Sequence, residues 1–287
     1  IDNIFDKDFI LTITLQTIHI PRMLVETYKS DSESKACMLT FYPEFDFETT
    51  QVTIEIIYLI DSSNSMDGKT MKQAKQLAHL FLSNMISSTN KNNNILFNIV
   101  TFGSDNDECF PVSVPLIKEN LDKAKHFVLH SLSHRGNTDL FSVLRNYSLL
   151  SGRGERNFIL LSDGHLNDMK AIILLLKQQQ MKHDRFFTCS ISETANKHNL
   201  KQLISCTSGG GQSTVFDTNY RSKWKIKVLN ILESIRQPCV NGIVIDWHNE
   251  QLDENNNLQF LQAPSHIHSL FNGQRLTVYG FINNCYK

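Results

Sequence analysis

Short apolar runs alternate with amphipathic helical periods between residues 51 and 238, and this alternation limits the folds open to the chain. The first run, Thr53 to Ile60, is typical of a buried strand. The next segment, Gly68 to Met85, places its apolar residues on one face of a helix. Strands separated by helices of this length form βαβ units. We therefore expect an α/β fold with a doubly wound, mainly parallel sheet and helices on both faces.

The same pattern continues along the region. Further strands are expected at 95–102, 158–161, 186–191 and 214–216. Helices are expected at 68–85, 117–129, 139–150, 168–180, 195–205 and 220–235. Pro238 ends the last of these helices because proline does not continue a helix.

The segments on either side of this region have β character. Strands are expected there at 8–15, 36–42, 242–247 and 275–281. A polar loop over 30–34 separates the first two, and a polar loop rich in Asn separates the last two. These changes of pattern divide the chain into residues 1–50, 51–238 and 239–287. Because two strands alone do not make a stable sheet, we expect residues 1–50 to be the end of a β-domain. The two outer segments are candidates for one shared sheet.

The composition excludes several classes of protein. The chain carries 28 basic and 29 acidic side chains, so it has no positive surplus with which to neutralise a nucleic acid backbone. No run of about 18 uncharged apolar residues is present, so no membrane span is expected. The six cysteines are dispersed and form no C-x-x-C pair, which favours reduced thiols in a cytosolic setting.

The sharpest motif is the D-x-S-x-S run from Asp61 to Ser65, which directly follows the first apolar strand. Open α/β sheets bind ligands at the carboxyl ends of their strands. A loop at that edge presents one carboxylate and two hydroxyls, and oxygen ligands of this kind suit Mg²⁺ better than zinc. The plain alternative is a helix N-cap, for which Ser and Asp are favoured.

Two later segments add oxygen ligands in the expected topology. Thr138 lies in a loop that opens a helix, and Asp163 follows a strand. Together with the D-x-S-x-S run, they resemble the von Willebrand factor type A domain and its metal-ion-dependent adhesion site. The resemblance implies a Mg²⁺ site, with Mn²⁺ as a substitute, that leaves one coordination position for an acidic residue of a protein partner. The implied ligands are Asp61, Ser63, Ser65, Thr138 and Asp163.

The sequence departs from the family at Asn64, where many members have Gly. This substitution removes no ligand. The run from Leu160 to Gly164, which carries Asp163, is also compatible with an ordinary turn, and the loop with Thr138 is compatible with a helix cap.

A second resemblance covers the whole chain. Residues 8–11 and 36–43 are similar to the end of a VIT domain, which precedes the type A domain in some proteins. Within that group the chain resembles the vault-associated poly(ADP-ribose) polymerases. The segments that carry this likeness are 61–66, 162–166, 194–198, 262–265 and 269–281. The likeness implies a cytoplasmic, vault-associated protein, with the nucleus as a second location and vault particle proteins as partners.

The sequence gives no sign of catalysis in this chain. An ADP-ribosyltransferase site needs His-Gly-Ser or His-Gly-Thr, which is absent, so NAD⁺ is expected only for a catalytic domain elsewhere in a longer parent. The start at Ile1 rather than Met favours such a parent. The G-x-S-x-G elbow of a hydrolase is also absent.

Other candidate sites are weaker. Gly209–Ser213 lacks the Lys of a phosphate-binding loop and is interpreted as a turn. His266 and His268 lack a third metal ligand, His165 is a candidate partner contact, and Cys109 belongs to no catalytic motif. The leading hypothesis is a Mg²⁺-dependent protein-binding module. The alternatives are a metal-free scaffold or an adhesion domain like those of inter-alpha-trypsin inhibitor heavy chains.

Overall fold

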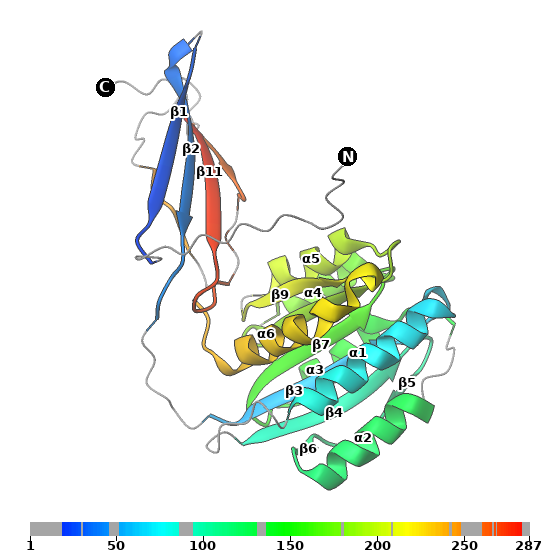
Figure 1. Cartoon of the computed structure of the whole chain (residues 1–287). Helices are drawn as coiled ribbons and strands as arrows, with labels where there is room; N and C mark the ends of the chain where they lie inside the picture. The colour runs from blue at the N-terminus through cyan, green and yellow to red at the C-terminus, as the bar shows by residue number, and fades with distance from the viewer. Residues whose placement is uncertain are drawn as a thin grey trace, which may run out of the picture. The chain divides into compact units, whose positions relative to one another are not determined.

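The computed structural model divides the chain into two compact units (Figure 1). The sheet unit comprises residues 1–45, 246–265 and 272–287, and the α/β unit comprises residues 46–245 and 266–271. The structure describes residues 19–29, 31–45, 52–85, 94–130, 136–178, 181–207, 209–240, 243–247, 260–265, 267 and 269–282.

The α/β unit is built on a seven-stranded sheet in the order β5-β4-β3-β7-β8-β9, with β6 also paired to β4. The strands β4, β3, β7, β8 and β9 are parallel to their neighbours in this order. The short strands β5 and β6 run antiparallel to β4. The strands are β3 (Ile54–Asp61), β4 (Ile95–Phe102), β5 (Asn106–Glu108), β6 (Val114–Pro115), β7 (Glu155–Ser162), β8 (Arg185–Ile191) and β9 (Gly211–Phe216). The predicted α/β class with a mainly parallel sheet is confirmed.

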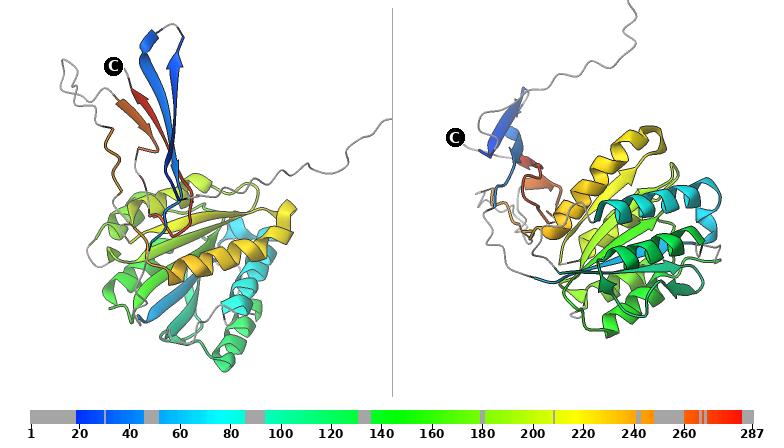
Figure 2. Two further views of the ribbon diagram at one scale, coloured as in Figure 1. Left: turned by 60° about the vertical axis from the view of Figure 1, so that its left-hand side comes forward. Right: turned by 60° about the horizontal axis from the view of Figure 1, so that its bottom comes forward.

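Helices cover both faces of this sheet (Figure 2). Strand β3 shows why, because Tyr58 and Ile60 face one core while Ile57 and Leu59 face the other, and all four are buried. One face carries α1 (Lys69–Met85), α2 (Lys118–His130) and α6 (Trp224–Arg236). The other carries α3 (Leu140–Leu149), α4 (Met169–Leu176) and α5 (Lys197–Cys206). Within the described residues, no helix has the length and apolarity needed to cross a membrane.

The helix ends differ from the predictions where side chains cap the backbone. The helix predicted from residue 220 begins at Trp224, after the 3₁₀ helix η4 (Thr218–Lys223). Asp217 caps η4 by accepting a hydrogen bond from the Asn219 amide, and the non-helical backbone of Tyr220 interrupts the turn. Strand β9 begins at Gly211, earlier than predicted, and the strands β5 and β6 were not predicted because they are very short.

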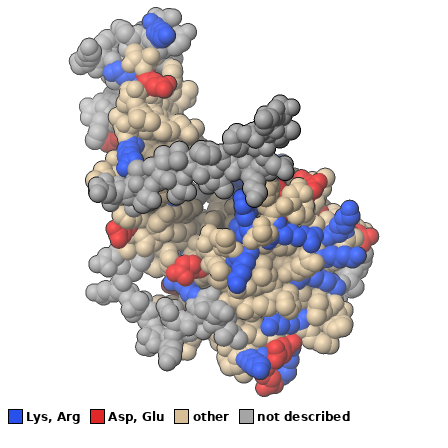
Figure 3. Space-filling model, in the orientation of Figure 1, with Lys and Arg blue, Asp and Glu red and all other residues tan. Residues whose placement is uncertain are grey.

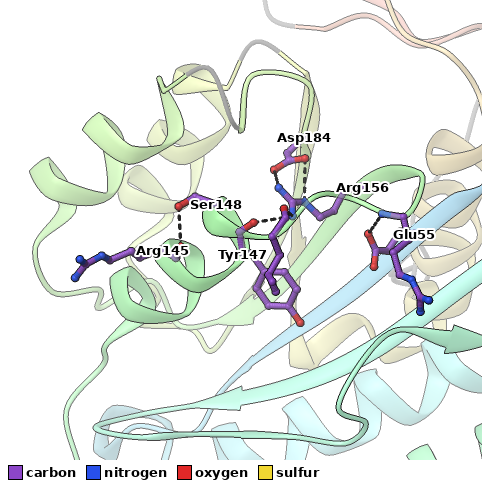
Figure 4. A network of polar contacts seen from close by, with 8 residues as sticks. Glu55, Arg145, Tyr147, Ser148, Arg156 and Asp184 are labelled. Carbon is purple, nitrogen blue, oxygen red and sulfur yellow. Dashed lines mark hydrogen bonds and ion pairs between the residues drawn. The ribbon is translucent and has the colours of Figure 1, made fainter.

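A buried ion pair lies at the amino ends of β7 and β8 (Figure 4). The Arg156 guanidinium donates from Nε and Nη2 to the two carboxylate oxygens of Asp184, at 3.0 and 2.6 Å. Its Nη1 donates to the backbone carbonyls of Tyr147 and Leu150, where α3 ends. Burial raises the pKa of Asp184, although the hydrogen bond from Arg156 opposes this rise. These contacts join α3, β7 and β8 at the edge opposite the carboxyl ends of the parallel strands.

The sheet unit contains four antiparallel strands in the order β1-β2-β11-β10. They are β1 (Arg22–Tyr28), β2 (Asp31–Phe41), β10 (Phe260–Ala263) and β11 (Leu276–Ile282). Segments from both ends of the chain therefore share one sheet. On this sheet the Trp247 indole packs over Gly280 and donates from Nε1 to Oε1 of Gln262 at 2.8 Å.

Three predictions for the outer segments were wrong, and a fourth is not tested by the described residues. The polar loop predicted at 30–34 is part of β2 from Asp31 onward, because Asp31 pairs with Tyr28 and Lys35 with Thr27, while residues 32–34 lie in the irregularity between these two pairs. The strand predicted at 242–247 is absent from residues 243–247, and β10 instead lies in the segment interpreted as a loop. The strand predicted at 8–15 lies outside the described residues.

Candidate functional site

The D-x-S-x-S run begins at the last residue of β3. Asp61 is fully buried, and its Oδ1 accepts a hydrogen bond from the Ser63 amide at 3.0 Å. Its Oδ2 accepts a hydrogen bond from the Ser162 hydroxyl at 2.6 Å. The Ser62 hydroxyl donates to the carbonyl of Phe102 at 2.9 Å, which fastens the loop to the end of β4. The Asp61 carboxylate is therefore held in place at the carboxyl edge of the sheet.

The next two hydroxyls of the run lie side by side. Ser63 and Ser65 have their Oγ atoms 3.1 Å apart, with Ser63 buried and Ser65 exposed. Asn64, Ser65 and Met66 form one 3₁₀ turn, η1, for which Ser63 is the N-cap residue. The Ser63 side chain makes no capping hydrogen bond to that turn. The plain helix-cap alternative therefore does not explain the Ser63 hydroxyl.

The loop that carries Thr138 is tied to this run by backbone hydrogen bonds. The Asn64 amide donates to the carbonyl of Gly136 at 2.8 Å, and the Asp139 amide donates to the carbonyl of Gly103, after β4, at 2.9 Å. Thr138 itself is buried. Asp139 caps α3 by accepting a hydrogen bond from the Ser142 amide. Thr138 is thus brought to the same sheet edge as the D-x-S-x-S run, as the sequence predicts.

Asp163 follows β7, the strand beside β3. The Ser162 hydroxyl, which donates to Asp61, also accepts a hydrogen bond from the Gly164 amide at 2.9 Å. Oδ1 of Asp163 accepts a hydrogen bond from the His165 amide at 3.1 Å. The Asp163 carbonyl accepts another from the Asn196 amide at 2.7 Å. Ser162 therefore links the two carboxylate-bearing loops, a role that the sequence reasoning missed.

The role of Ser162 follows once the register of β7 against β3 is known. Ser162 is the residue of β7 that comes directly after Leu161, which pairs with Ile60 across the parallel ladder. A hydroxyl there must lie next to Asp61, because neighbouring parallel strands end at one edge. Asn64 has an exposed side chain, and it is its backbone amide that joins the D-x-S-x-S run to the loop of Gly136.

The electrostatics of the site suit a cation. Burial raises the pKa of Asp61, and the nearby negative charge of Asp163 adds to the rise, whereas hydrogen bonds from Ser162 and Ser63 oppose it. Both carboxylates are buried, and neither forms an ion pair with a Lys or Arg of the described residues. The five predicted ligands would offer two carboxylates and three hydroxyls, and Mg²⁺ prefers oxygen ligands.

This donor set differs from the metal sites that are built from His, Cys, Asp and Glu side chains alone. No group of three or more His, Cys, Asp or Glu residues suited to a metal is present in the described part of the chain. A site at this edge would therefore depend on Ser and Thr hydroxyls as well as on the carboxylates.

Within the residues that the structure describes, the weaker candidates show no additional site. Gly209–Ser213 leads into β9, and the Gly211 amide donates to the hydroxyl of Ser269 at 3.0 Å. His165 is exposed near the site, whereas His266 and His268 lie outside the described residues.

Cys109 lines a hollow of about 700 Å³ beside α2, together with His126 and other residues of that helix. Burial raises the pKa of Cys109 to about 11, so the thiol is protonated near neutral pH. Because the thiolate is the nucleophilic form, this hollow does not have the character of a cysteine active site.

Comparison with known proteins supports the fold and the family. A family model described as von Willebrand factor type A domain matches residues 54–213. Protein mono-ADP-ribosyltransferase PARP4 from Mus musculus is 36% identical over 280 residues, which make up 96% of this chain and 14% of that protein. The Homo sapiens protein of the same name is 36% identical over 96% of this chain and 15% of its own length. A von Willebrand factor A domain-containing protein of Dictyostelium discoideum is 29% identical over 98% of this chain and 13% of its length.

The chain therefore spans only 13–15% of the length of these relatives. Solved structures show the same fold at low identity. A von Willebrand factor type A structure from Catenulispora acidiphila gives a TM-score of 0.53 at 12% identity, covering 96% of this chain and 68% of that one. The PilB minor pilin from Streptococcus sanguinis gives 0.52 at 11% identity, covering 75% and 77% of the two chains.

Proposed function

The chain belongs to the von Willebrand factor type A family, and from this premise we propose that its α/β unit is a Mg²⁺-dependent protein-binding module. Domains of this family typically mediate interactions between proteins. The observation that carries the metal dependence is the pair of buried carboxylates, Asp61 and Asp163, at one sheet edge without a basic partner among the described residues. A bound divalent cation would balance this charge.

The proposed site uses hydroxyls and carboxylates in different roles. Ser63, Ser65 and Thr138 would offer hydroxyl oxygens to the metal, while Asp61 and Asp163 would act mainly through bound water. Bound Mg²⁺, or Mn²⁺ in its place, would supply a positive centre, and an acidic side chain of a partner would take its remaining coordination position. Ser162 and the Ser63 amide keep the Asp61 carboxylate oriented, because each donates a hydrogen bond to one of its oxygens.

A metal-free scaffold is the second candidate function. Both carboxylate oxygens of Asp61 accept hydrogen bonds, and the hydroxyls of Ser63 and Ser65 lie within hydrogen-bonding distance of each other. The edge is thus internally bonded without a cation. In that case the module would bind partners through its helix faces and flanking strands alone.

The relatives suggest a wider setting for the module. We propose that it is a non-catalytic region of an ADP-ribosyltransferase-like protein, in a vault-associated cytoplasmic setting with vault particle proteins as partners. The names of two relatives describe a mono-ADP-ribosyltransferase, and the matched region covers only 14–15% of those proteins. The use of NAD⁺ is accordingly proposed for a part of such proteins that this chain does not match.

Thermal unfolding with EDTA, Mg²⁺, Mn²⁺ or Ca²⁺ tests the metal site. A ligand at one hundred times its dissociation constant adds about 2.7 kcal/mol of stability. Each kcal/mol shifts the midpoint of a domain of 150–250 residues by about 2–4 °C, so we expect a rise of about 5–11 °C with Mg²⁺. Asp61→Asn and Asp163→Asn should abolish that rise.

Asp168→Asn is the matched control. Asp168 is an exposed carboxylate near the same edge, and its side chain makes no capping bond to α4. This variant should keep the full response to Mg²⁺. No shift in the parent chain at millimolar Mg²⁺, or equal shifts in all variants, would favour the metal-free scaffold.

A further inference from the structure

Two neighbouring helical segments of the α/β unit carry basic side chains and no acidic ones. Helix α1 has three lysines and neither Asp nor Glu. The segment 218–232, which includes η4 and most of α6, has one arginine, three lysines and no acidic residue. This concentration is unusual in a chain whose net charge is −1.

Five of these seven basic side chains face the solvent. The other two form hydrogen bonds within the α/β unit. Lys75 Nζ donates to the carbonyl of Leu129 at 2.9 Å, and Lys227 Nζ donates to the carbonyl of Val215 at 2.6 Å. The exposed five, here called the basic face, are Lys69, Lys72, Arg221, Lys223 and Lys225. Figure 3 shows Lys and Arg side chains gathered on this side of the unit.

The basic face lies beside the candidate metal edge. Helix α1 follows the D-x-S-x-S run, and η4 follows the carboxyl end of β9, so both segments begin at the carboxyl edge of the sheet. Helices α1 and α6 then pack against each other on one side of it. The five charges are therefore presented together near that edge.

Exposed apolar surface accompanies these charges. Tyr220 and Ile226 are 56% and 62% exposed. The Lys223 ammonium lies 5.1 Å from the centre of the Tyr220 ring, and the Arg221 guanidinium lies 5.9 Å from that of Trp224. These cation–π contacts hold two of the charges in place without neutralising them. The surface thus combines positive charge with accessible apolar side chains.

We propose that the basic face binds an acidic protein segment that carries an aromatic or apolar side chain among its carboxylates. The carboxylates would pair with the exposed Lys and Arg side chains, and the apolar side chain would contact Tyr220 and Ile226. This contact does not need the metal, so the proposal goes beyond the function proposed above.

The surroundings favour a short acidic segment over a long polyanion. Glu193 and Asp217 lie at the start of η4, where Glu193 accepts a hydrogen bond from the Thr218 hydroxyl and Asp217 caps the turn. These carboxylates limit the positive surface on that side. The net charge of −1 also gives no general attraction for nucleic acid or an anionic membrane.

Fluorescence anisotropy in EDTA tests the proposal with a labelled glutamate-rich peptide that has phenylalanine at its centre. The triple variant Arg221→Gln/Lys223→Gln/Lys225→Gln should bind it roughly tenfold more weakly, since each exposed ion pair contributes modestly. The control variant Lys170→Gln/Lys197→Gln/Lys201→Gln removes the same charge from exposed sites on α4 and α5 and should bind within about twofold of the parent.

Two further arms make the result decisive. Tyr220→Ser/Ile226→Ser should weaken binding of the phenylalanine-containing peptide and leave binding of an all-glutamate peptide unchanged. Mg²⁺ in place of EDTA should leave the affinity of the parent chain for the peptide unchanged, because the proposed contact does not use the metal. Equal losses in both triple variants would overturn the proposal. The proposal would also be overturned if poly(U) or phosphatidylserine vesicles bound more tightly than the peptide and if the triple variant at Arg221, Lys223 and Lys225 lost that binding.

Discussion

Replacing Gly164 by Ala tests how the loop that carries Asp163 is positioned. Gly164 has a φ of +79°, a conformation that costs an L-residue about 1–2 kcal/mol. A methyl group there would also collide with the backbone carbonyl oxygen of Asn196 and approach Cγ of Leu200 to 3.1 Å. Overpacking of this kind costs about 1–3 kcal/mol. The two contributions together give an expected loss of about 2–5 kcal/mol.

Gly68→Ala is the matched control. Gly68 has nearly the same φ, +72°, but a methyl group there would meet no atom within 4 Å. Only the conformational cost applies, so we expect a loss of about 1–2 kcal/mol. The comparison of the two variants therefore isolates the collision with the Asn196 carbonyl from the strain of the backbone.

Urea denaturation measures both losses, provided that the slope of unfolding free energy against urea is unchanged. In thermal scans, the midpoint should fall by about 4–20 °C for Gly164→Ala and by about 2–8 °C for Gly68→Ala. Displacement of this loop should also weaken the response to Mg²⁺, because Asp163 precedes Gly164. Equal losses in the two variants would refute the idea that the close approach of Asn196 positions the loop.

The remaining predictions concern a buried ion pair and a buried thiol. Asp184→Ala leaves the Arg156 side chain, only 4% exposed, without its carboxylate partner and should lower the free energy of unfolding in urea by about 3–5 kcal/mol. Asp122→Ala, at an exposed site, is the control and should cost little. A loss below about 1 kcal/mol for Asp184→Ala would contradict this account. Because burial raises the pKa of Cys109 to about 11, its alkylation by iodoacetamide should accelerate about tenfold per pH unit up to pH 10, measured by peptide mass mapping. A plateau near pH 8.5, as for an unperturbed cysteine, would show that the thiol is not desolvated.

Local patterns were sufficient for much of the α/β unit. The apolar run that became β3 is buried on both faces, as expected for a central parallel strand, and the predicted helices 68–85 and 117–129 differ from α1 and α2 by at most one residue at each end. The candidate ligands could be named in advance for a physical reason. Parallel strands carry their carboxyl ends to one edge, so Asp61 and Asp163 were expected to be neighbours once the strands were identified.

Local patterns were insufficient where long-range pairing decides the structure. Asp31 and Lys35 pair with β1 and so bring the polar segment between them into β2, and β10 exists because Phe260–Ala263 pairs with β11. Neither segment has a strong strand preference of its own. The backbone hydrogen bonds of these sheets depend on partners that are distant in sequence, which composition and periodicity do not report.

The sequence by itself determined the α/β class, the order of its longer strands and helices, and the five candidate metal ligands, because periodicity and strand-end positions are local properties. Only the tertiary structure decided that Ser162 bridges the two carboxylate loops and that the Asn64 amide holds the Thr138 loop. It also decided that four lysines and one arginine, from two segments more than a hundred residues apart in sequence, lie on one basic face. These features require the strand order and the packing of helices, which arise from contacts between distant residues.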